Sequence, residues 1–595
     1  MAGTGVDLRS RLLLALAGVA VAFAAADTYV VVLALPDMMS AAGLSSDELQ
    51  RAAPLISGFL LGYVGMLPLI GRIADLRGRS PVLVGSLVIF AAGSLVTAAA
   101  YDLPTMVTGR FVQGVGGGGL VPATLALVAD LWPVERRGLP LGVVGAVQEL
   151  GSVLGPLFGA LVLAVADWRA IFWVNLTVAL VLAAAIVRSA GTPDAGGTAE
   201  HPSSRPRPGR PWPDWLGAVV AGVALAGLAT VMRQPGALVT DVFWGQAFLP
   251  VLGGSRWLTP LAFGVYALGA AFVLRQLTAA RPLLAWRQWH GVAAQTDLAG
   301  ALLLGGALAG VIVAFASADP EVAVLSERGW WWLLAAAVAA LAFARRQQTS
   351  AHPLIPRGSL RARAARGALG VSFLVGAALI AALVDIPFYA RLTIYGDSQV
   401  AAALVLVRFL AALPVGAVLG GALTRRIAAG PLTAIGMALA AAGFAGMAAW
   451  DADALRSPLA TVPLVLAGLG FGLALAPVNA ALLAATDRGV HGVSSALLVV
   501  SRMVGMLVGI SVLTAIGLRR FYAIAEAVPP VAELCPADPT TCPEYGERLR
   551  AAGLEQLEVV FLGAMACATL AGVLALVVFR GAAAPQTSMR SASSS

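Results

Sequence analysis

Long apolar stretches separated by short polar segments run along most of the 595-residue chain. An α-helix rises about 1.5 Å per residue, so roughly 20 apolar residues cross the hydrocarbon core of a bilayer. Only helices and closed barrels satisfy the backbone hydrogen bonds there, and a barrel strand needs only about 10 residues. The stretches are longer than that, so the pattern predicts an all-α integral membrane protein.

Sixteen such stretches fall into groups of six, four and six. The first six lie near residues 12–36, 53–72, 81–101, 103–126, 139–164 and 169–189. The middle four lie near 214–233, 257–277, 296–316 and 329–345, and the last six near 367–392, 399–424, 428–449, 459–484, 489–516 and 556–580. This grouping predicts two six-helix bundles, residues 1–189 and 367–580, separated by four accessory transmembrane helices in 214–345. The polar segments are interpreted as cytoplasmic linkers at 190–213 and 346–366, a periplasmic loop at 517–555 and a cytoplasmic tail at 581–595.

Arginine residues recur in every second loop. They are Arg72, Arg77 and Arg79; Arg136 and Arg137; Arg205, Arg207 and Arg210; Arg281 and Arg287; Arg357, Arg361, Arg363 and Arg366; and Arg425 and Arg426. Loops enriched in basic residues stay in the cytoplasm. An even number of spans then places both termini in the cytoplasm, with the chain in a bacterial inner membrane.

The four accessory helices resemble a duplicated pair. Residues 213–218, at the start of the first pair, are similar to 295–301, at the start of the second. The two pairs end in the similar segments 277–283 and 348–354. Chance similarity between apolar sequences is the alternative interpretation. In either case, an insertion between two bundles is expected to lie at the periphery.

Composition narrows the class of protein. Only 12% of the residues are charged and 59% are hydrophobic, whereas about a quarter of a soluble domain is charged. The net charge of +8 comes from arginines spread thinly between apolar runs, which excludes a nucleic-acid-binding module. The four histidines have no metal-ligand spacing, and no phosphate-binding loop is present, so we expect no enzyme activity, no metal and no cofactor.

The loop after the second span has a distinctive pattern. Gly71 and Gly78 permit a tight turn and close backbone approach. Asp75 can accept hydrogen bonds from the N-terminus of a facing helix or pair with an arginine such as Arg79. Such a contact would be a conformational latch, formed in one state and released in another. An ordinary positive-inside loop is the alternative, but it does not explain Asp75.

The fifth span carries a helix-bending motif. Gly151, Gly155 and Gly159 recur every four residues, which lets helices approach closely, and Pro156 can bend the helix. The fourth span carries Arg110, followed by Gln113, Gly114 and a run of four glycines at 116–119.

The Asp75 loop, the segment beginning at Arg110 and the Gly155-Pro156 segment resemble, in order and spacing, three signature motifs of the major facilitator superfamily. Asp27 followed by Ala34-Leu35-Pro36, and Trp168-Arg169 with Phe172 and Asn175, are similar to its drug:proton antiporter branch with extra central helices. The resemblance implies the major facilitator fold and transport driven by protons. In it, Arg110 corresponds to an arginine that tunes the proton site; a helix-end arginine reaching the interface is the alternative.

Three further stretches, residues 27–32, 148–156 and 491–506, resemble a group of mycobacterial exporters. That group moves triacylglycerides with a lipoprotein partner and is also linked to drug efflux. The resemblance implies a lipid or other lipophilic substrate and a periplasmic lipoprotein as partner. A multidrug:proton antiporter and a non-transporting membrane scaffold are the competing interpretations.

Ionisable residues inside a membrane cost about 2.5–3.5 kcal/mol each, so each needs a partner or a function. We expect Asp27 and Glu149 to lie in one low-dielectric cavity as proton-coupling carboxylates, with Arg502 pairing with them in one conformation. A permanent salt bridge that fixes helix packing is the alternative. Asp385 and Arg408 are expected to form a structural pair in the second bundle.

Two cysteines, Cys535 and Cys542, share the polar loop 517–555 and could form a disulfide if the loop faces an oxidising space. If the helices flanking this loop extend outward, it could guide a lipophilic product or dock an outer partner. A solvated connector is the alternative.

Overall fold

The computed structural model describes residues 8–44, 52, 54–189, 214–251, 255–279, 292, 295–316, 329–395, 398–535 and 542–580. The predicted linker at 190–213, Arg281 and Arg287, and the tail at 581–595 lie outside the described residues.

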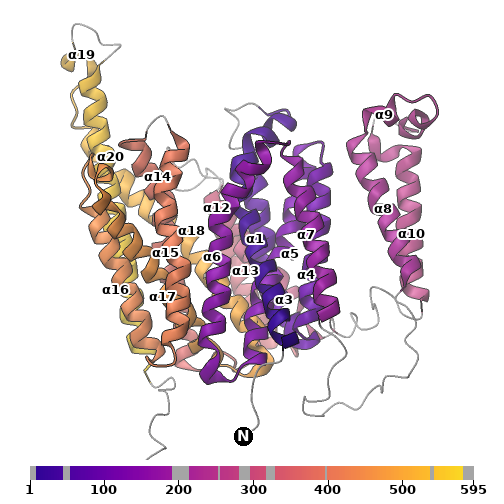
Figure 1. Ribbon diagram of the computed structural model, residues 1–595, viewed down its shortest axis with the longest axis horizontal. Helices are drawn as coiled ribbons and strands as arrows, with labels where there is room; N and C mark the ends of the chain where they lie inside the picture. The colour runs from indigo at the N-terminus through magenta and orange to yellow at the C-terminus, as the bar shows by residue number, and fades with distance from the viewer. Residues whose placement is uncertain are drawn as a thin grey trace, which may run out of the picture.

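Sixteen helices of 19 or more residues are present in this described part, in the predicted order (Figure 1). The first bundle contains α1 (Leu8–Ala41), α3 (Pro54–Arg77), α4 (Arg79–Ala99), α5 (Leu103–Leu131), α6 (Gly138–Leu163) and α7 (Arg169–Ser189). The accessory helices are α8 (Trp215–Arg233), α10 (Pro260–Thr278), α12 (Leu298–Ala316) and α13 (Gly329–Thr349). The second bundle contains α14 (Arg363–Leu392), α15 (Gln399–Leu423), α16 (Ala429–Ala448), α17 (Thr461–Ala484), α18 (His491–Ala525) and α20 (Pro543–Val578).

Thirteen helices in the described residues are long and apolar enough to cross a membrane. The fold class is therefore confirmed, whereas sixteen membrane crossings stay a prediction. Helix α13 illustrates the difference, because its last turns carry Arg345, Arg346 and two glutamines, which lower its mean hydropathy.

The predicted loop at 517–555 is wrong in part. Helix α18 continues to Ala525 and α20 begins at Pro543, so most of this segment is helical, with the short helix α19 (Val531–Leu534) at its tip. These helices project beyond their neighbours (Figure 1). An ion pair of 2.5 Å between Arg520 and Glu555 joins α18 to α20 in this projection.

The helices define two faces. One, here called the arginine-rich face, carries the loops with Arg72 to Arg79, Arg136 and Arg137, and Arg425 and Arg426; the other is called the opposite face. Helix α1 runs parallel to α6, because Gly151 meets Ala22 and Gly155 meets Ala26. Helix α20 runs antiparallel to α14, because Gly367 meets Val578 and Gly553 meets Leu392. Both described ends of the chain therefore lie on the arginine-rich face.

The accessory helices form two hairpins with the same internal contacts. Asp214 accepts a hydrogen bond from Gly217 N–H at the start of α8 and pairs with Arg275 of α10. Asp297 accepts one from Gly300 N–H at the start of α12 and pairs with Arg346 of α13. This repetition supports the predicted duplication over chance similarity.

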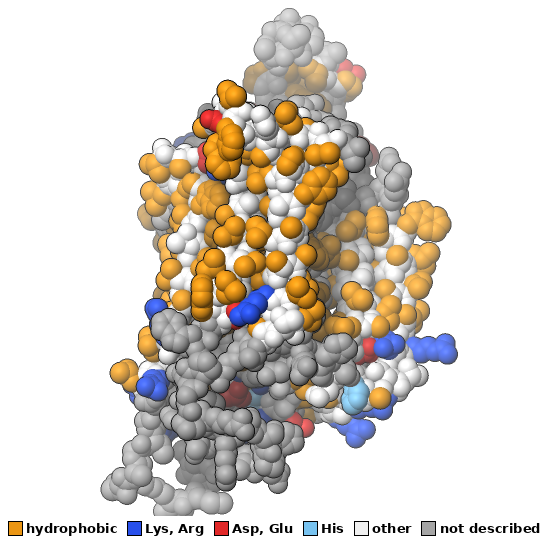
Figure 2. Space-filling model, turned by 90° about the vertical axis from the view of Figure 1, so that its right-hand side faces the viewer, with side chains coloured by type: hydrophobic (Ala, Val, Ile, Leu, Met, Phe, Trp, Pro, Cys, Tyr) orange, Lys and Arg blue, Asp and Glu red, His pale blue; other side chains and the backbone are white. Residues whose placement is uncertain are grey.

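The two hairpins occupy different places. Helix α12 packs against α3, where Gly305 and Gly65 approach each other. The hairpin of α8 and α10 stands beside α4 and α7 at one edge of the molecule (Figure 1). Its outward surface is largely hydrophobic between its two ends (Figure 2). The sequence predicted a peripheral position for all four accessory helices, and the hairpin of α8 and α10 fits that prediction better than the hairpin of α12 and α13.

Candidate functional site

A buried ion pair lies inside the first bundle. Arg110 Nη1 on α5 donates to Asp27 Oδ2 on α1 at 2.6 Å, and their side chains are 1% and 0% exposed. Arg110 lies seven residues into α5, about 10 Å from the opposite face. A helix-end arginine that reaches the interface is thereby excluded, because the guanidinium is fully buried.

Polar partners satisfy both members of this pair. Arg110 Nη1 also donates to Gln113 Oε1 at 2.7 Å, and Gln113 Nε2 donates to Ser94 Oγ at 3.0 Å. Asn175 Nδ2 on α7 donates to Asp27 Oδ1. The ring of Phe59 lies under the guanidinium at 4.4 Å. Side chains from five helices of the first bundle, α1, α3, α4, α5 and α7, thus form this network, and those of α5 and α7 contact the carboxylate itself.

A second pair joins the two bundles. Arg502 Nη1 on α18 lies 3.9 Å from Glu149 Oε1 on α6, and each side chain is 12% exposed. Each residue is eleven positions into its helix from the arginine-rich face, about 16 Å deep. This depth is close to the middle of a hydrocarbon core about 30 Å thick.

The expectation of one shared cavity for Asp27 and Glu149 is wrong. Because Gly151 lies opposite Ala22 and α1 is parallel to α6, Glu149 is level with residue 20 of α1. Asp27 is seven residues farther along, about 10 Å by helical rise. Arg502 accordingly faces Glu149, while Asp27 has its own arginine.

A pocket surrounds Glu149 and Arg502 between the bundles. Its space for water is about 40 Å³, enough for a few molecules and far too small for a lipid. Its walls are mostly apolar, and Asn479 Oδ1 there has no hydrogen-bond partner within the described structure. The lining residues are Val121, Leu125, Leu141, Val144, Gly145, Gln148, Glu149, Ser372, Val375, Ala474, Leu475, Val478, Asn479, Leu498, Val499 and Arg502.

The predicted latch contact is present on the arginine-rich face. Asp75 accepts hydrogen bonds from the N–H groups of Gly492 at 2.7 Å and Val493 at 3.0 Å, at the start of α18. Arg79 Nη1 pairs with Asp75 at 2.6 Å, and Arg79 Nε pairs with Asp130 at 3.1 Å. Asp75 therefore accepts hydrogen bonds from a helix N-terminus and pairs with an arginine at the same time, although the sequence alone offers these contacts as alternatives. Gly78 has a φ of +87°, which explains a glycine at that turn.

Glycines bring the two bundles together on the same face. A Cβ on Gly71 would lie 2.6 Å from the carbonyl oxygen of Gly492, so α3 and α18 touch backbone to backbone. Gly138 and Gly142 of α6 meet α15 in the same way, against Gly421 and Ala417. By contrast, the hydrophobic cluster at the opposite face of the first bundle, which includes Val30, contains residues of that bundle alone. The bundles are therefore closed against each other on the arginine-rich face.

The glycines of the predicted helix-bending motif pack α6 against α1. Gly151 lies against the carbonyl of Ala22 and Gly155 against that of Ala26, so a side chain at either position would clash with backbone. Gly159 is buried. Helix α6 runs unbroken through Pro156, and bending there stays a prediction.

The predicted pair of Asp385 and Arg408 does not form. Arg408 Nη1 donates instead to Thr461 Oγ1 on α17 at 3.1 Å. No ion pair to Asp385 is found within the described residues. The sequence places both residues in neighbouring helices, but it does not define the face of each helix that they occupy.

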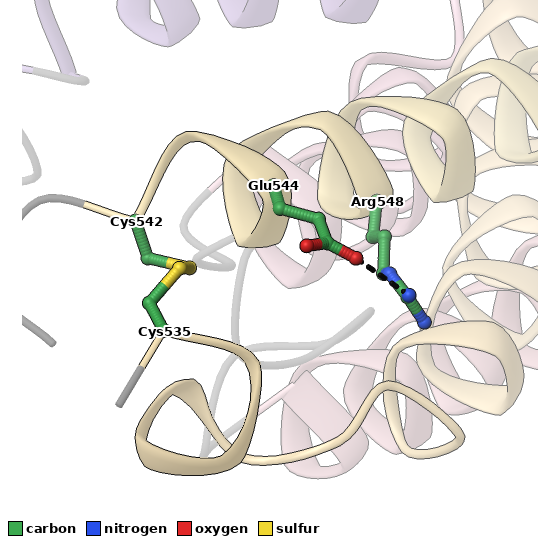
Figure 3. Close-up of a disulfide and its surroundings, with 4 residues drawn as sticks. All are labelled: Cys535, Cys542, Glu544 and Arg548. Carbon is green, nitrogen blue, oxygen red and sulfur yellow. Dashed lines mark hydrogen bonds and ion pairs between the residues drawn. A yellow bond between two sulfur atoms is a disulfide. The ribbon is translucent and has the colours of Figure 1, made fainter. Parts of the chain in front are cut away.

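The disulfide that the sequence left open is present. Cys535 and Cys542 are joined, with their Cα atoms 5.7 Å apart, at the tip of the projection between α18 and α20 (Figure 3). Glu544 and Arg548 form an ion pair of 2.8 Å on the first turns of α20 (Figure 3). Among the described residues, no cluster of three metal-ligating side chains occurs.

Some residues of these networks were missed from sequence. No motif in the sequence distinguishes three of the polar residues that complete these networks, namely Ser94, Asp130 and Thr461. The ion pairs of the accessory hairpins had a signal, because Asp-x-x-Gly and Arg-Gln each occur at matching places in the two repeats.

Known proteins match this arrangement. The sequence model of the protein family described as the Major Facilitator Superfamily matches residues 17–345 of this chain. A triacylglyceride transporter of Mycolicibacterium hassiacum is 35% identical over 538 residues, which cover 88% of this chain and 82% of that protein. A triacylglyceride transporter of Mycobacterium tuberculosis is 33% identical over 542 residues, covering 88% and 86%. A solved proton:xylose symporter of the superfamily superposes with a TM-score of 0.53 at 13% identity, covering 96% of this chain and 95% of that one. This chain is therefore a multi-pass membrane transporter that belongs to the major facilitator superfamily.

Proposed function

We propose that this protein is a proton-coupled exporter of triacylglyceride-like lipids or other very lipophilic molecules, working by alternating access. The substrate class is inferred from relatives that are named triacylglyceride transporters and that align with this chain over most of their length. In the state described here the pocket between the bundles is too small for such a molecule, so its mostly apolar walls would meet the substrate only after the bundles move apart. The observation that carries the coupling mechanism is the pairing of Glu149 and Arg502 across the two bundles.

Protonation of Glu149 would remove an attraction between the bundles. With Glu149 ionised, Arg502 favours the state closed on the arginine-rich face, which the positive-inside rule places in the cytoplasm. A proton from outside would neutralise Glu149, weaken this closure and shift the population toward a cytoplasm-open state. Release of the proton to the cytoplasm, followed by substrate entry and renewed pairing, would complete export.

Asp27 and Arg110 are assigned a second role in the same cycle. Their contacts lie within the first bundle, so protonation of Asp27 would change the packing of α1, α5 and α7 rather than the contact between bundles. A permanent structural pair is the alternative. If Asp27 takes up a proton during the cycle, Asp27→Asn should remove the response of transport to a proton gradient; if the pair is only structural, a folded Asp27→Asn variant should keep that response.

The projecting hairpin of α18 and α20 is where an outer partner such as a periplasmic lipoprotein would be met. A variant with residues 526–542 replaced by a short linker should keep its folding and lose delivery to such a partner. Undiminished export in cells by that variant would identify the hairpin as a connector.

Transport by the purified chain in proteoliposomes tests the proposal. Labelled triacylglyceride and a cationic dye would be followed with and without a pH gradient. We expect gradient-driven movement of the lipid, and Glu149→Gln should retain gradient-independent exchange while losing the response to the gradient. Glu558→Gln is the matched control, because Glu558 is exposed on α20 and forms no ion pair among the described residues.

Three results would contradict parts of the proposal. Full gradient-driven export by both Glu149→Gln and Asp27→Asn would refute the coupling assignment. Movement of the dye but not of the lipid would identify a multidrug antiporter. No transport of either substrate by a folded, correctly inserted chain would favour the scaffold.

A further inference from the structure

Three arginines gather at the opposite face, where the first accessory hairpin meets the first bundle. Arg256 precedes α10, Arg233 ends α8, and Arg169 begins α7. The guanidinium of Arg256 lies 3.6 Å from the ring centroid of Tyr101, in the loop after α4. Arg169 Nη2 donates to the carbonyl of the adjacent Ala100 at 3.2 Å. Arg233 and Arg169 are close enough to repel each other electrostatically.

Of these three arginines, only Arg169 is paired with a carboxylate among the described residues. Asp167 is 3.9 Å from Arg169, and its side chain is 60% exposed. Asp102 caps α5 by accepting from Thr105 N–H, and Asp241 accepts from the N–H groups of Phe243 and Trp244. In the described structure Arg233 has no hydrogen-bond or ion-pair partner. Arg233 and Arg256 therefore have no ion-pair partner among the described residues, although Arg256 Nη1 donates to the carbonyl of Met232 at 2.7 Å.

Apolar surface leads away from the cluster on both sides. Val88 and Ile89 of α4 are 47% and 39% exposed, and Val219 and Val223 of α8 are 52% and 51% exposed. The hairpin is joined to the bundle beside the arginines, where Trp257 Nε1 donates to Tyr101 Oη at 2.8 Å. Along the rest of its length the hairpin presents hydrophobic side chains (Figure 2).

We propose that Arg169, Arg233 and Arg256 bind the phosphate of an anionic phospholipid, whose acyl chains lie along the apolar surface of the accessory hairpin. Guanidinium groups bind phosphate through paired, charge-assisted hydrogen bonds, so the phosphate of a headgroup can accept from these arginines. Tyr101 and Trp257 lie half-buried beside the arginines, and such aromatic residues are typical of the depth at which headgroups lie. A triacylglyceride has no charge, so this site differs in chemistry from the proposed transport site.

Binding to the delipidated, full-length chain tests the proposal. Short-chain phosphatidylglycerol, phosphatidylcholine and inorganic phosphate would each be titrated, with bound ligand counted by native mass spectrometry. We expect phosphatidylglycerol to bind at least tenfold more tightly than phosphatidylcholine. Arg233→Gln, which breaks no contact of the described structure, should weaken that binding several-fold, and adding Arg256→Gln should abolish the preference.

Arg188→Gln provides the matched control, since Arg188 is exposed at the other end of α7. It should bind phosphatidylglycerol as the wild type does. Equal binding of the two lipids, or wild-type binding by Arg233→Gln, would overturn the proposal. Displacement of phosphatidylglycerol by an equal concentration of inorganic phosphate would assign the site to a free anion and overturn the lipid assignment.

Discussion

Asp75 Oδ1 accepts a hydrogen bond of 2.7 Å from the backbone N–H of Gly492, 417 residues later in the chain. The carboxylate lies at the N-terminus of α18, where the helix dipole favours a negative charge. One acidic side chain of the first bundle thereby holds the second bundle on the arginine-rich face.

Removal of this charge should open the contact. Asp75→Ala deletes two hydrogen bonds to a charged acceptor, each worth about 1.5–3 kcal/mol, and should shift the population toward separation on the arginine-rich face. Distances between spin labels at positions 136 and 425, in a Cys567→Ser background, would measure the shift. An unchanged distance distribution in Asp75→Ala would show that the contact does not control closure.

Gly71 should be equally sensitive, for a steric reason. In Gly71→Ala the new Cβ would lie 2.6 Å from the Gly492 carbonyl oxygen, so the backbones must separate at a cost of about 1–3 kcal/mol. The same pair of labels should report opening. Gly85→Ala on α4 is the control, because a Cβ there meets no atom within 4 Å. Opening in Gly85→Ala as well would point to a general effect of the substitution.

Asp27 and Arg110 should depend strongly on each other for the stability of the fold. Asp27→Asn leaves a buried guanidinium without its counter-charge, which costs about 3–5 kcal/mol. Arg110→Gln should cost a similar amount, and the double variant should be much less destabilised than the sum. Thermal unfolding in detergent would measure this coupling. Additive effects would mean that the two charges stabilise the fold independently.

Asp214 and Asp297 should each stabilise one accessory hairpin. Asp214→Asn should speed amide exchange at the start of α8 and leave α12 unchanged, whereas Asp297→Asn should do the reverse. Faster amide exchange at the starts of both α8 and α12 in either variant would contradict the idea that the two hairpins are stabilised independently.

The contribution of Asp214 should also depend on pH. Burial opposes ionisation of this carboxylate, but hydrogen bonds from Gly217 and Arg275 outweigh burial and hold its pKa below the ordinary value. A lowered pKa in the folded state gives stabilisation that is full above the unfolded pKa, about 4, and is lost as the pH falls below it. Exchange at α8, corrected for intrinsic rates, should therefore accelerate below pH 4. Acceleration between pH 5 and 7 would contradict this assignment.

The sequence alone determined the helices, their order and the family. Apolar length fixes where a chain can cross a bilayer, and the loop arginines fix the alternation of faces, because both properties act locally. The loop pattern after the second span singled out Asp75, and a position inside an apolar span singled out Arg110, Glu149 and Arg502 as residues that need a partner. The duplicated hairpin was visible because its two copies retain the same capping and pairing residues.

Only the tertiary structure decided which buried charged residues pair with each other. Asp27 and Glu149 lie on neighbouring helices, yet the parallel register of α1 and α6 sets them about 10 Å apart and gives each its own arginine. Arg408 met Thr461 rather than Asp385 because the rotation of each helix about its axis depends on packing by all its neighbours. Local sequence does not encode that rotation or register, so the pairing of buried charges emerges only when the bundles are packed.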